Sequence, residues 1–474
     1  MTKKITIKPI SRIEGHGKIT LHLNDEGEVD KALFHVTQVR GFEKICAGRP
    51  FYEMPSLTAR ICGICTVSHL MASAKACDAL LAVRIPPAGG ELRRLMNLAQ
   101  IIQSHALSFF YLSSPDLLLG LDDEPQKRNV FELAKTHPQL IKDGIALRQF
   151  GQEVIQILGG KRIHPTWVVP GGVSEPLRLD QRDEILQRIP DALDCIQRTL
   201  TVKKRLLDQR REEARTFANF PSLFMSMVDD KGRLSYYDGH LRFMDATGKI
   251  IADNIEAEDY ADWIGEAVEP WTYLKFPYYK PQGYPGGMYR VGPLARLNLI
   301  DYCGTPLADR EWTEFRQIER GPTLSSFYYH YARLIEVLFC LERMQRLLDS
   351  PEILSKHVRA HAQVNALEGV GMVEAPRGTL IHHYEIDEEG LIQKANLVVA
   401  TGHNNLAMNQ GVLQVARHFI HGGKLEEGML NRVEAVIRTF DPCLSCSTHA
   451  FGEMPLVVEL YDAEGQKCDQ LLRR

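Results

Sequence analysis

The chain has 474 residues, of which 44% are hydrophobic and 24% charged, and its formal net charge is -4. These proportions are typical of a soluble globular protein with a sizeable core, and the slightly acidic balance argues against nucleic acid or an anionic membrane as the partner. No apolar run approaches the ~18 residues of a membrane-spanning helix, and the charged start MTKKITIKPI lacks an apolar signal region, which favours a cytoplasmic location.

The first half of the chain changes from a strand pattern to a helical one. Residues 1–45 alternate apolar and polar side chains, which predicts strands with a hairpin at NDEG. Residues 50–220 have apolar side chains at three- and four-residue spacing, which predicts a helical core. We expect its last long helix to be kinked or broken near Pro190.

The second half is mixed. Residues 221–320 are rich in Gly, Pro and Tyr, and are expected to form an irregular excursion with small hairpins. Residues 321–449 return to a helical pattern, with a hairpin that turns at residues 388–390. Because no repeat or clean linker divides the chain, we expect one integrated α+β unit that is predominantly helical, with small peripheral β elements.

Two pairs among the ten cysteines have CxxC spacing: Cys62 and Cys65, and Cys443 and Cys446. Such a pair can chelate one ion, and soft thiolates select zinc, copper, nickel or iron–sulfur centres. A single pair is more often a redox dithiol or half of a structural zinc site. Here 377 residues lie between the pairs, whereas a zinc ribbon has about 15–20. A reactive metal held deep between helices by both ends of the chain is therefore the favoured interpretation.

Five sequence blocks together resemble the large subunit of nickel–iron hydrogenases: RIEGH, RGFE, RICGIC followed by SH, APRG, and DPCLSCSTH. They run in the family's order from Arg12 to His449, nearly the whole chain. The stretches SHALSFFYLSSPD and VVATGHNNLAMN are similar to the soluble bidirectional branch, which is coupled to NAD through separate diaphorase subunits. The resemblance implies a large-subunit fold over residues 1–449, with a long-helix bundle, and reversible heterolytic cleavage of H2 to protons and electrons.

By this resemblance, Cys62, Cys65, Cys443 and Cys446 hold nickel, and the second cysteine of each pair also bridges to an iron that carries CO and cyanide. A soft thiolate shell suits a metal that changes its oxidation state. Heterolysis also needs a base. The resemblance gives that role to a terminal cysteine sulfur, Cys443, and implies that Glu14 passes the proton on. Without the resemblance, Glu14 would be interpreted as a surface carboxylate.

The resemblance also implies a set of supporting residues. Arg377 would polarise substrate over the open face of the cluster, although a lone arginine is usually a surface ion-pair partner. Asp116 and Asp441 would orient Arg377 and the thiolate loop. His69 would donate to a bridging sulfur, unless it is only a satisfied core histidine. Thr401 stands where the family hydrogen-bonds a cyanide, but the proline that usually precedes it is absent.

A magnesium ion near the C-terminus is implied as well, with Glu43, His449 and the backbone carbonyl of Leu397 as ligands. In this family an endopeptidase cuts after the histidine of the last motif once the metal is inserted. Here the cut would fall between His449 and Ala450 and release residues 450–474 as a propeptide. The alternative is that MPLVVELY in this tail is an edge strand of the mature fold.

The chain has no further clustered cysteines for an iron–sulfur cluster, and no GxGxxG follows a predicted strand to bind a nucleotide. The resemblance therefore implies a small iron–sulfur subunit, docked near the first cysteine pair, and diaphorase subunits that bind FMN and NAD. It also implies a maturation endopeptidase and metal-insertion proteins. Two other classes stay open: a non-catalytic relative of the quinone-proximal subunit of respiratory complex one, which would have lost the cysteines, and a structural zinc protein.

Overall fold

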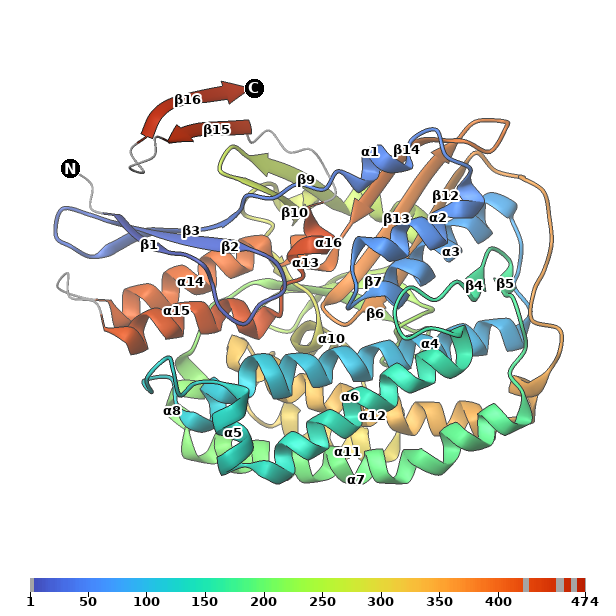
Figure 1. The fold of residues 1–474 in the computed structure, drawn as a ribbon, viewed down its shortest axis with the longest axis horizontal. Coiled ribbons are helices and arrows are strands. Elements are labelled where there is room, and N and C mark those ends of the chain that lie inside the picture. The colour runs from blue at the N-terminus through green and yellow to red at the C-terminus, as the bar shows by residue number, and fades with distance from the viewer. Residues whose placement is uncertain (1–3, 421–425, 449–455, 462–466, 474) are drawn as a thin grey trace.

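The computed structural model describes residues 4–420, 426–448, 456–461 and 467–473 (Figure 1). Its α-helices are α1 (Phe42–Cys46), α2 (Met54–Thr58), α3 (Thr66–Leu81), α4 (Pro87–Ala106), α5 (Val130–Thr136), α6 (Pro138–Gly159), α7 (Leu179–Gln209), α8 (Arg211–Thr216), α9 (Tyr260–Trp263), α10 (Pro293–Leu299), α11 (Pro306–Arg316), α12 (Tyr329–Asp349), α13 (Ala400–His403), α14 (Asn405–Phe419), α15 (Glu427–Phe440) and α16 (Leu444–Ser447). Two π-helical segments, η3 (Leu107–Ser113) and η4 (Pro115–Leu119), continue α4.

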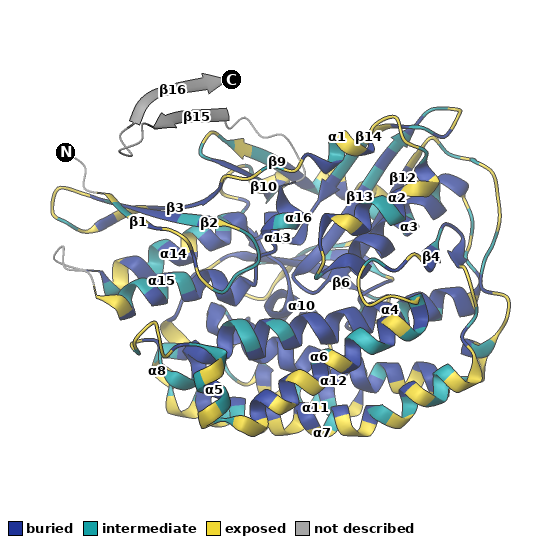
Figure 2. Cartoon of the chain, in the orientation of Figure 1, coloured by how far each residue is buried: buried dark blue, intermediate teal, exposed yellow. Residues whose placement is uncertain are grey.

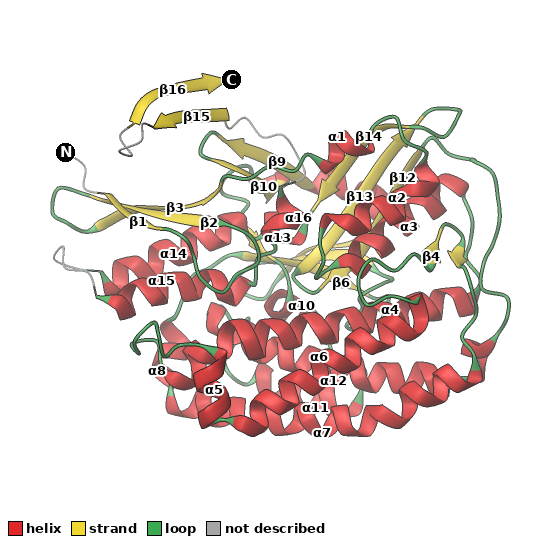
Figure 3. Cartoon of the chain, in the orientation of Figure 1, coloured by secondary structure: helices red, strands yellow, loops and turns green. Residues whose placement is uncertain are grey.

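The strands are β1 (Lys4–Ile7), β2 (Gly17–Leu23), β3 (Val29–Val36), β4 (Val168–Val169), β5 (Gly172–Val173), β6 (Leu223–Val228), β7 (His240–Met244), β8 (Ile250–Ile255), β9 (Ile264–Glu269), β10 (Thr272–Tyr279), β11 (Tyr289–Arg290), β12 (Glu368–Ala375), β13 (Gly378–Ile386), β14 (Ile392–Val398), β15 (Leu456–Tyr461) and β16 (Lys467–Arg473). Figure 3 shows that the long helices gather in one layer and the sheets in another. The expected α+β architecture with a helical core is confirmed. Among the described helices, none is long and apolar enough to cross a membrane.

The helical layer is built from α4, α6, α7 and α12, which pack against one another. Their inward faces are buried, whereas the outer face of α7 is exposed (Figure 2). The break expected at Pro190 is absent, because α7 runs on through this residue. Pro190 is exposed, so the carbonyl that loses its hydrogen bond can be hydrated. Ile185 and Ile189 on the other face stay buried and hold the helix in place.

The sheet nearest the candidate site is antiparallel, with the order β12-β13-β14. The hairpin of β13 and β14 was predicted, but β12 was not. Nearly all of β12 is buried, so the alternation that marks a half-exposed strand is missing. Helix α3 packs directly on β12. A Cβ at Gly371 would lie 2.0 Å from the carbonyl oxygen of Ala72, so this close approach requires glycine.

The middle segment is more regular than the sequence predicted. Strands β6, β7 and β8 form an antiparallel ladder, β11 pairs in parallel with β6, and β9 and β10 form a separate hairpin. All residues of β6 are buried. Its composition therefore carries no alternating signal from which a strand could be predicted.

The loop between β1 and β2 meets the segment that carries the C-terminal cysteine motif. The predicted N-terminal hairpin is present as β2 and β3, and β1 completes a three-stranded sheet. Helix α14 packs on β3, and α15 packs on α14. Helix α15 then leads to α16, which contacts α13. This arrangement brings the C-terminal cysteine motif to the loop between β1 and β2.

Candidate metal centre

The two CxxC pairs form one buried cluster. The Cys62 and Cys443 sulfurs are 3.3 Å apart, and the Cys446 sulfur lies 2.8 Å from that of Cys65 and 2.9 Å from that of Cys443. All four sulfurs lie within 4.8 Å of one another. With metal–sulfur bonds of about 2.3 Å, neighbouring sulfurs of a four-coordinate site would be roughly 3.3–3.8 Å apart. A slight outward shift of the sulfurs would therefore fit one ion.

Local backbone geometry places each pair. Cys62 precedes a tight turn, and its sulfur accepts hydrogen bonds from the backbone N–H groups of Ile64 and Cys65, at 3.2 and 3.4 Å. Cys65 is the N-cap of α3, and Cys443 is the N-cap of α16. Each pair therefore stands where an extended segment turns into a helix, which directs both sulfurs of the pair to one side.

Electrostatics favour a soft cation at this cluster. Hydrogen bonds from Cys443, Cys446 and Cys65 hold the pKa of Cys62 well below its usual range. Burial raises the pKa of Cys443 and of Cys446. Without a metal, the cluster therefore favours one ionised thiolate and neutral thiols at the other cysteines, because several buried anions would repel one another. A metal ion that binds all four sulfurs removes this conflict.

A small cavity of about 10 Å³ adjoins the cluster, with Arg377, His69 and Thr401 in its wall. A single water needs ~10–15 Å³ by the same measure, so the space suits only a very small ligand. Ser68 also lines it, and its buried hydroxyl has no hydrogen-bond partner among the described residues. Sequence reasoning missed Ser68, although it directly precedes His69 in the first turn of α3.

Arg377 stands in the turn between β12 and β13 and is held by Asp441. Its Nε donates to the Asp441 carbonyl, and its Nη2 lies 3.2 and 3.1 Å from the two Asp441 carboxylate oxygens. Burial opposes the charge of Arg377, but Asp441 and the neighbouring cysteines raise its pKa well above its usual range. The guanidinium is therefore a fixed cation in the cavity wall. Asp441 thus contacts Arg377, the residue that it was expected to orient, and has a left-handed φ of 53° at the end of α15.

Glu14 is hydrogen-bonded to the C-terminal cysteine loop. Its carboxylate accepts hydrogen bonds from the backbone N–H of Ser445, at 3.0 Å, and from the Ser445 hydroxyl. Its backbone carbonyl accepts from the N–H of Leu444 at 3.3 Å. The adjoining Gly15 has a φ of +85°, and a Cβ there would meet the Leu444 side chain at 2.6 Å. In the described part of the chain, the Glu14 carboxylate makes no hydrogen bond to a cysteine sulfur.

His69 lies against the cluster as expected. Its Nε2 is 3.3 Å from the Cys446 sulfur, and its Nδ1 is 3.1 Å from Nε2 of His382. His382 continues to the Tyr384 hydroxyl at 2.7 Å. Thr401 has a contact that was not expected, because its hydroxyl accepts the N–H of Cys443 at 2.9 Å. His382 and Tyr384 were missed; their alternate positions on one strand are the only sequence signal.

Asp116 does not orient Arg377, contrary to the expectation. Within the described chain, this buried carboxylate pairs with Arg12 and, at 2.7 Å, with Arg438. Burial opposes ionisation, but these two guanidiniums lower the pKa of Asp116. Asp116 thus connects the loop that carries Glu14 to the helix that ends at the cysteine motif. The π-helical segment η4 places it there, and this could not be seen from the sequence.

Glu43 and Leu397, two of the expected magnesium ligands, are neighbours. The Glu43 carboxylate accepts the N–H of Leu397 at 2.9 Å, and Lys275 Nζ lies 3.7 Å from it. Burial raises the pKa of Glu43. His449, the third expected ligand, and Ala450 lie outside the described residues. The carbonyl of the preceding Thr448 accepts backbone N–H groups at residues 40–41, just before the helix that carries Glu43.

Comparison with known proteins decides the family. The family model described as nickel-dependent hydrogenase matches residues 40–125 and 203–449, and one described as HoxL-like matches residues 4–39. The chain belongs to the nickel-dependent hydrogenase family. Together with the buried four-cysteine cluster, this membership shows a hydrogenase with a nickel–iron centre. The structural zinc protein and the non-catalytic relative are not favoured.

Similar hydrogenases match over nearly the whole chain. The NAD-reducing hydrogenase HoxS subunit beta of Cupriavidus necator is 42% identical over all of both chains. The matching chain of the vhc F420-non-reducing hydrogenase of Methanococcus voltae is 43% identical over 98% of each chain. A crystal structure of an NAD+-reducing [NiFe]-hydrogenase in the H2-reduced state has a TM-score of 0.92 and 45% identity, covering 94% of this chain and 100% of that one. The Ni-Fe-Se hydrogenase from D. vulgaris Hildenborough shares the fold, with a TM-score of 0.78 and 23% identity over 95% and 100% of the two chains.

We expect Cys62→Ser to lower the nickel content of the purified hydrogenase by more than about tenfold, because a hard hydroxyl replaces a soft thiolate. Metal analysis per chain measures the effect. Cys195→Ser in α7 is the matched control, since this thiol is also buried but lies outside the cluster, and it should keep its nickel. A Cys62→Ser protein with full nickel content would contradict the ligand assignment.

We expect Arg377→Lys to keep nickel but to lower H2 oxidation with an artificial dye by about 10²–10³-fold, as for loss of an oriented active-site donor. A lysine keeps the charge but cannot reproduce the two-point contact with Asp441. Arg290→Lys, at a fully buried arginine that donates to Ser222 and to backbone carbonyls, controls for a general packing defect. Equal activity losses in both variants would argue against a role at the centre.

Proposed function

We propose that this chain is the H2-activating subunit of a complex that passes electrons through an iron–sulfur small subunit to NAD+ on diaphorase subunits that bind FMN. The observation that carries the proposal is the buried cluster of four cysteines, with the fixed cation Arg377 in the wall of the adjoining cavity. A cytoplasmic location for the complex is part of this proposal.

The proposed centre contains nickel and an iron with CO and cyanide ligands, and it would supply a redox-active site that binds and polarises H2. Cys62, Cys65, Cys443 and Cys446 would hold the two metals. The hydroxyl of Ser68, which has no hydrogen-bond partner among the described residues, would be a donor for a small ligand on the iron. Leu380 and Val399 in the same wall make it partly apolar, which disfavours a hydrated ion in this small space.

Proton transfer would begin at the Cys443 sulfur and continue through Glu14. Backbone pairing between Glu14 and Cys443 holds these residues side by side. Glu14 is half-buried, so its carboxylate lies between the dry cluster and solvent. Its hydrogen bonds to Ser445 orient it without neutralising it. A carboxylate in this position can take up a proton from the cluster and release it to water.

Magnesium would bind beside the centre through Glu43, the Leu397 carbonyl and His449. The contact between the Glu43 carboxylate and the Leu397 strand supports a common site. A divalent cation would also stabilise the ionised form of Glu43, which burial alone disfavours.

Electrons would leave on the side of the first cysteine pair. Gly63, at the tip of the CxxC turn, is exposed although both cysteines are buried. Close by, His164 contacts the Ala59 carbonyl at 3.0 Å, and the neighbouring Ile163 is 49% exposed. An exposed apolar side chain near the exposed CxxC turn suits docking of the iron–sulfur subunit.

We expect the complex, purified through a tag on this chain, to contain FMN and to form NADH from H2 and NAD+. Dye reduction without NADH formation would contradict the NAD assignment while leaving the hydrogenase intact. This outcome has to be tested, because the F420-non-reducing relative is as similar as the NAD-reducing one. The Cys62→Ser complex should lack both activities, which excludes a contaminating enzyme.

The C-terminal tail, residues 450–474, is proposed to be a propeptide removed by a maturation endopeptidase after metal-insertion proteins have loaded the centre. Two observations support the cut between His449 and Ala450. The family match ends at residue 449, and β15 and β16 pair only with each other among the described strands.

We expect the intact mass of the chain from active complex to correspond to an end at His449, and the chain from nickel-starved cells to extend to Arg474. Mass spectrometry of the two preparations tests this directly. An active, nickel-loaded chain that keeps all residues to Arg474 would contradict the proposal and favour a strand of the mature fold.

A further inference from the structure

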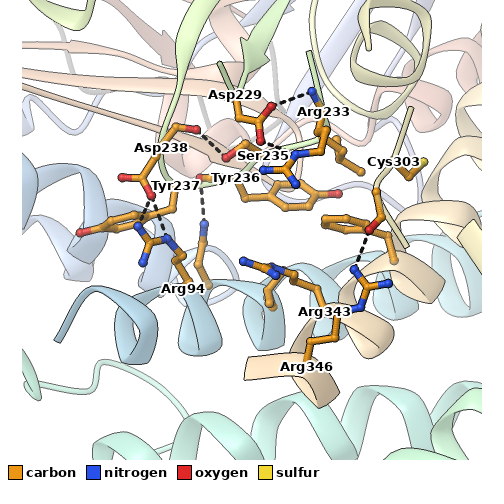
Figure 4. Close-up of a pocket in the computed structure, with 15 residues that line it drawn as sticks. Arg94, Asp229, Arg233, Ser235, Tyr236, Tyr237, Asp238, Cys303, Arg343 and Arg346 are labelled. Atoms are coloured by element: carbon orange, nitrogen blue, oxygen red, sulfur yellow. Dashed lines mark hydrogen bonds and ion pairs between the residues drawn. The ribbon is translucent and has the colours of Figure 1, made fainter. Parts of the chain in front are cut away.

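A second cavity, of about 240 Å³, lies between α4, α12 and the loop that joins β6 to β7 (Figure 4). It shares no lining residue with the small cavity beside the cysteines. Arg343 and Arg346 come from α12, Arg94 from α4, and Arg233 from the loop opposite. Nothing in the hydrogenase chemistry described above uses this cavity.

The charges around the cavity do not balance. Arg94 donates to Asp238, with its Nε 2.8 Å from the carboxylate, and Arg233 pairs with Asp229 at 2.7 Å. These are the two acidic residues in the lining, against four arginines. The carboxylate of Glu91, outside the lining, also interacts with Arg343 and Arg94, so one positive charge remains in excess.

Arg343 is the centre of this excess. Arg346 donates to the Gly304 carbonyl at 2.7 Å. Arg343, in contrast, makes no hydrogen bond or close ion pair with a carboxylate or carbonyl within the described part of the chain, although it is half-buried. Burial and then the neighbours Arg94, Arg233 and Arg346 lower the pKa of Arg343, and the nearby Glu91 carboxylate opposes them. A partly desolvated guanidinium with no hydrogen-bonded partner is costly, and an oxyanion is the ligand that satisfies it best, because two parallel N–H···O bonds fit its planar fork.

The other walls define the size and character of the ligand. The cavity is only a little smaller than the about 300–1,000 Å³ of pockets for drug-sized ligands, so it has room for a phosphate or a small organic acid together with bound water. The rings of Tyr236 and Phe339, 5.9 Å apart, form an apolar wall. Asn97 also lines the cavity, and its buried side-chain oxygen has no partner among the described residues. It can accept a hydrogen bond from a ligand hydroxyl or a protonated phosphate oxygen.

We propose that this cavity is a binding site for a small oxyanion, either a phosphate or a small carboxylic acid. Arg343 is its main contact, and Arg94, Arg233 and Arg346 add positive charge around it. The bound anion would cancel the excess charge and connect α4, α12 and the β6–β7 loop. The proposal does not depend on the electron acceptor of the hydrogenase.

Calorimetric titration of the purified complex tests the proposal, with inorganic phosphate in one arm and succinate in the other, at ionic strength held constant with sodium chloride. We expect saturable binding in at least one arm, and the arm that saturates identifies the class of anion. Arg343→Gln should weaken that binding at least tenfold. Arg316→Gln is the matched control, because Arg316 is also half-buried with no carboxylate partner among the described residues, but lies outside the cavity lining; it should bind like the unmodified protein.

Three results would overturn the site: no saturable binding in either arm, equal weakening by both substitutions, or unchanged binding in Arg343→Gln. Arg343 is partly solvent-exposed, so the substitution is not expected to prevent folding. Thermal unfolding of the variant without added anion verifies this point. If the complex binds neither anion but phosphate binds after the partner subunits are removed, a carboxylate of a partner fills the cavity, and the small-molecule proposal is wrong.

Discussion

Four sulfur atoms from opposite ends of the chain have to be buried together, and the rest of the structure depends on this constraint. The N-terminal pair is fixed by α3, which packs on β12. The C-terminal pair is fixed by a short backbone pairing between Glu14 and the segment after Cys443. Each pair supplies only two of the four sulfurs. The N-terminal and C-terminal segments must therefore come together before the centre is complete.

A fully buried charge network supports the fixed cation next to the cluster. Arg296 in α10 contacts Glu336 in α12 at 2.6 Å and Glu374 in β12 at 2.6 Å. It also donates to the carbonyl of Pro376, the residue before Arg377. Removing one partner from such a network leaves an uncompensated buried charge, which costs about 3–5 kcal/mol. The helical layer therefore holds the turn that carries Arg377 in position, and the position of Arg377 does not depend on Asp441 alone.

The sequence was informative where chemistry or periodicity is local. The CxxC spacing, the helical periodicity of residues 50–220 and the N-terminal hairpin each lie within a short window, and the structure contains the elements that they predicted. Contacts set by tertiary packing were not predictable. Asp116 faces Arg12 and Arg438 because a π-helical turn redirects it, and Pro190 is tolerated because it points to solvent.

Strands buried on both faces were missed for a related reason. Burial of nearly every residue removes the alternation of apolar and polar side chains in β6 and β12. Ser68 was missed because a serine on a helix carries no signal of its own. It becomes significant only when its hydroxyl is found buried without a partner beside the cysteines. Family resemblance supplied the roles proposed for Glu14, Glu43 and Arg377, which spacing alone would have left as ordinary charged residues.

The glycine contact between α3 and β12 has a mechanical consequence. At Gly371 the strand backbone lies directly against the helix backbone, with no layer of side chains between them. Side-chain layers yield under stress by changing rotamers, whereas two backbones in contact have little space to yield. The sheet therefore limits how far α3 can move towards it, and Cys65, which caps the start of that helix, is tied through the helix to the position of the sheet.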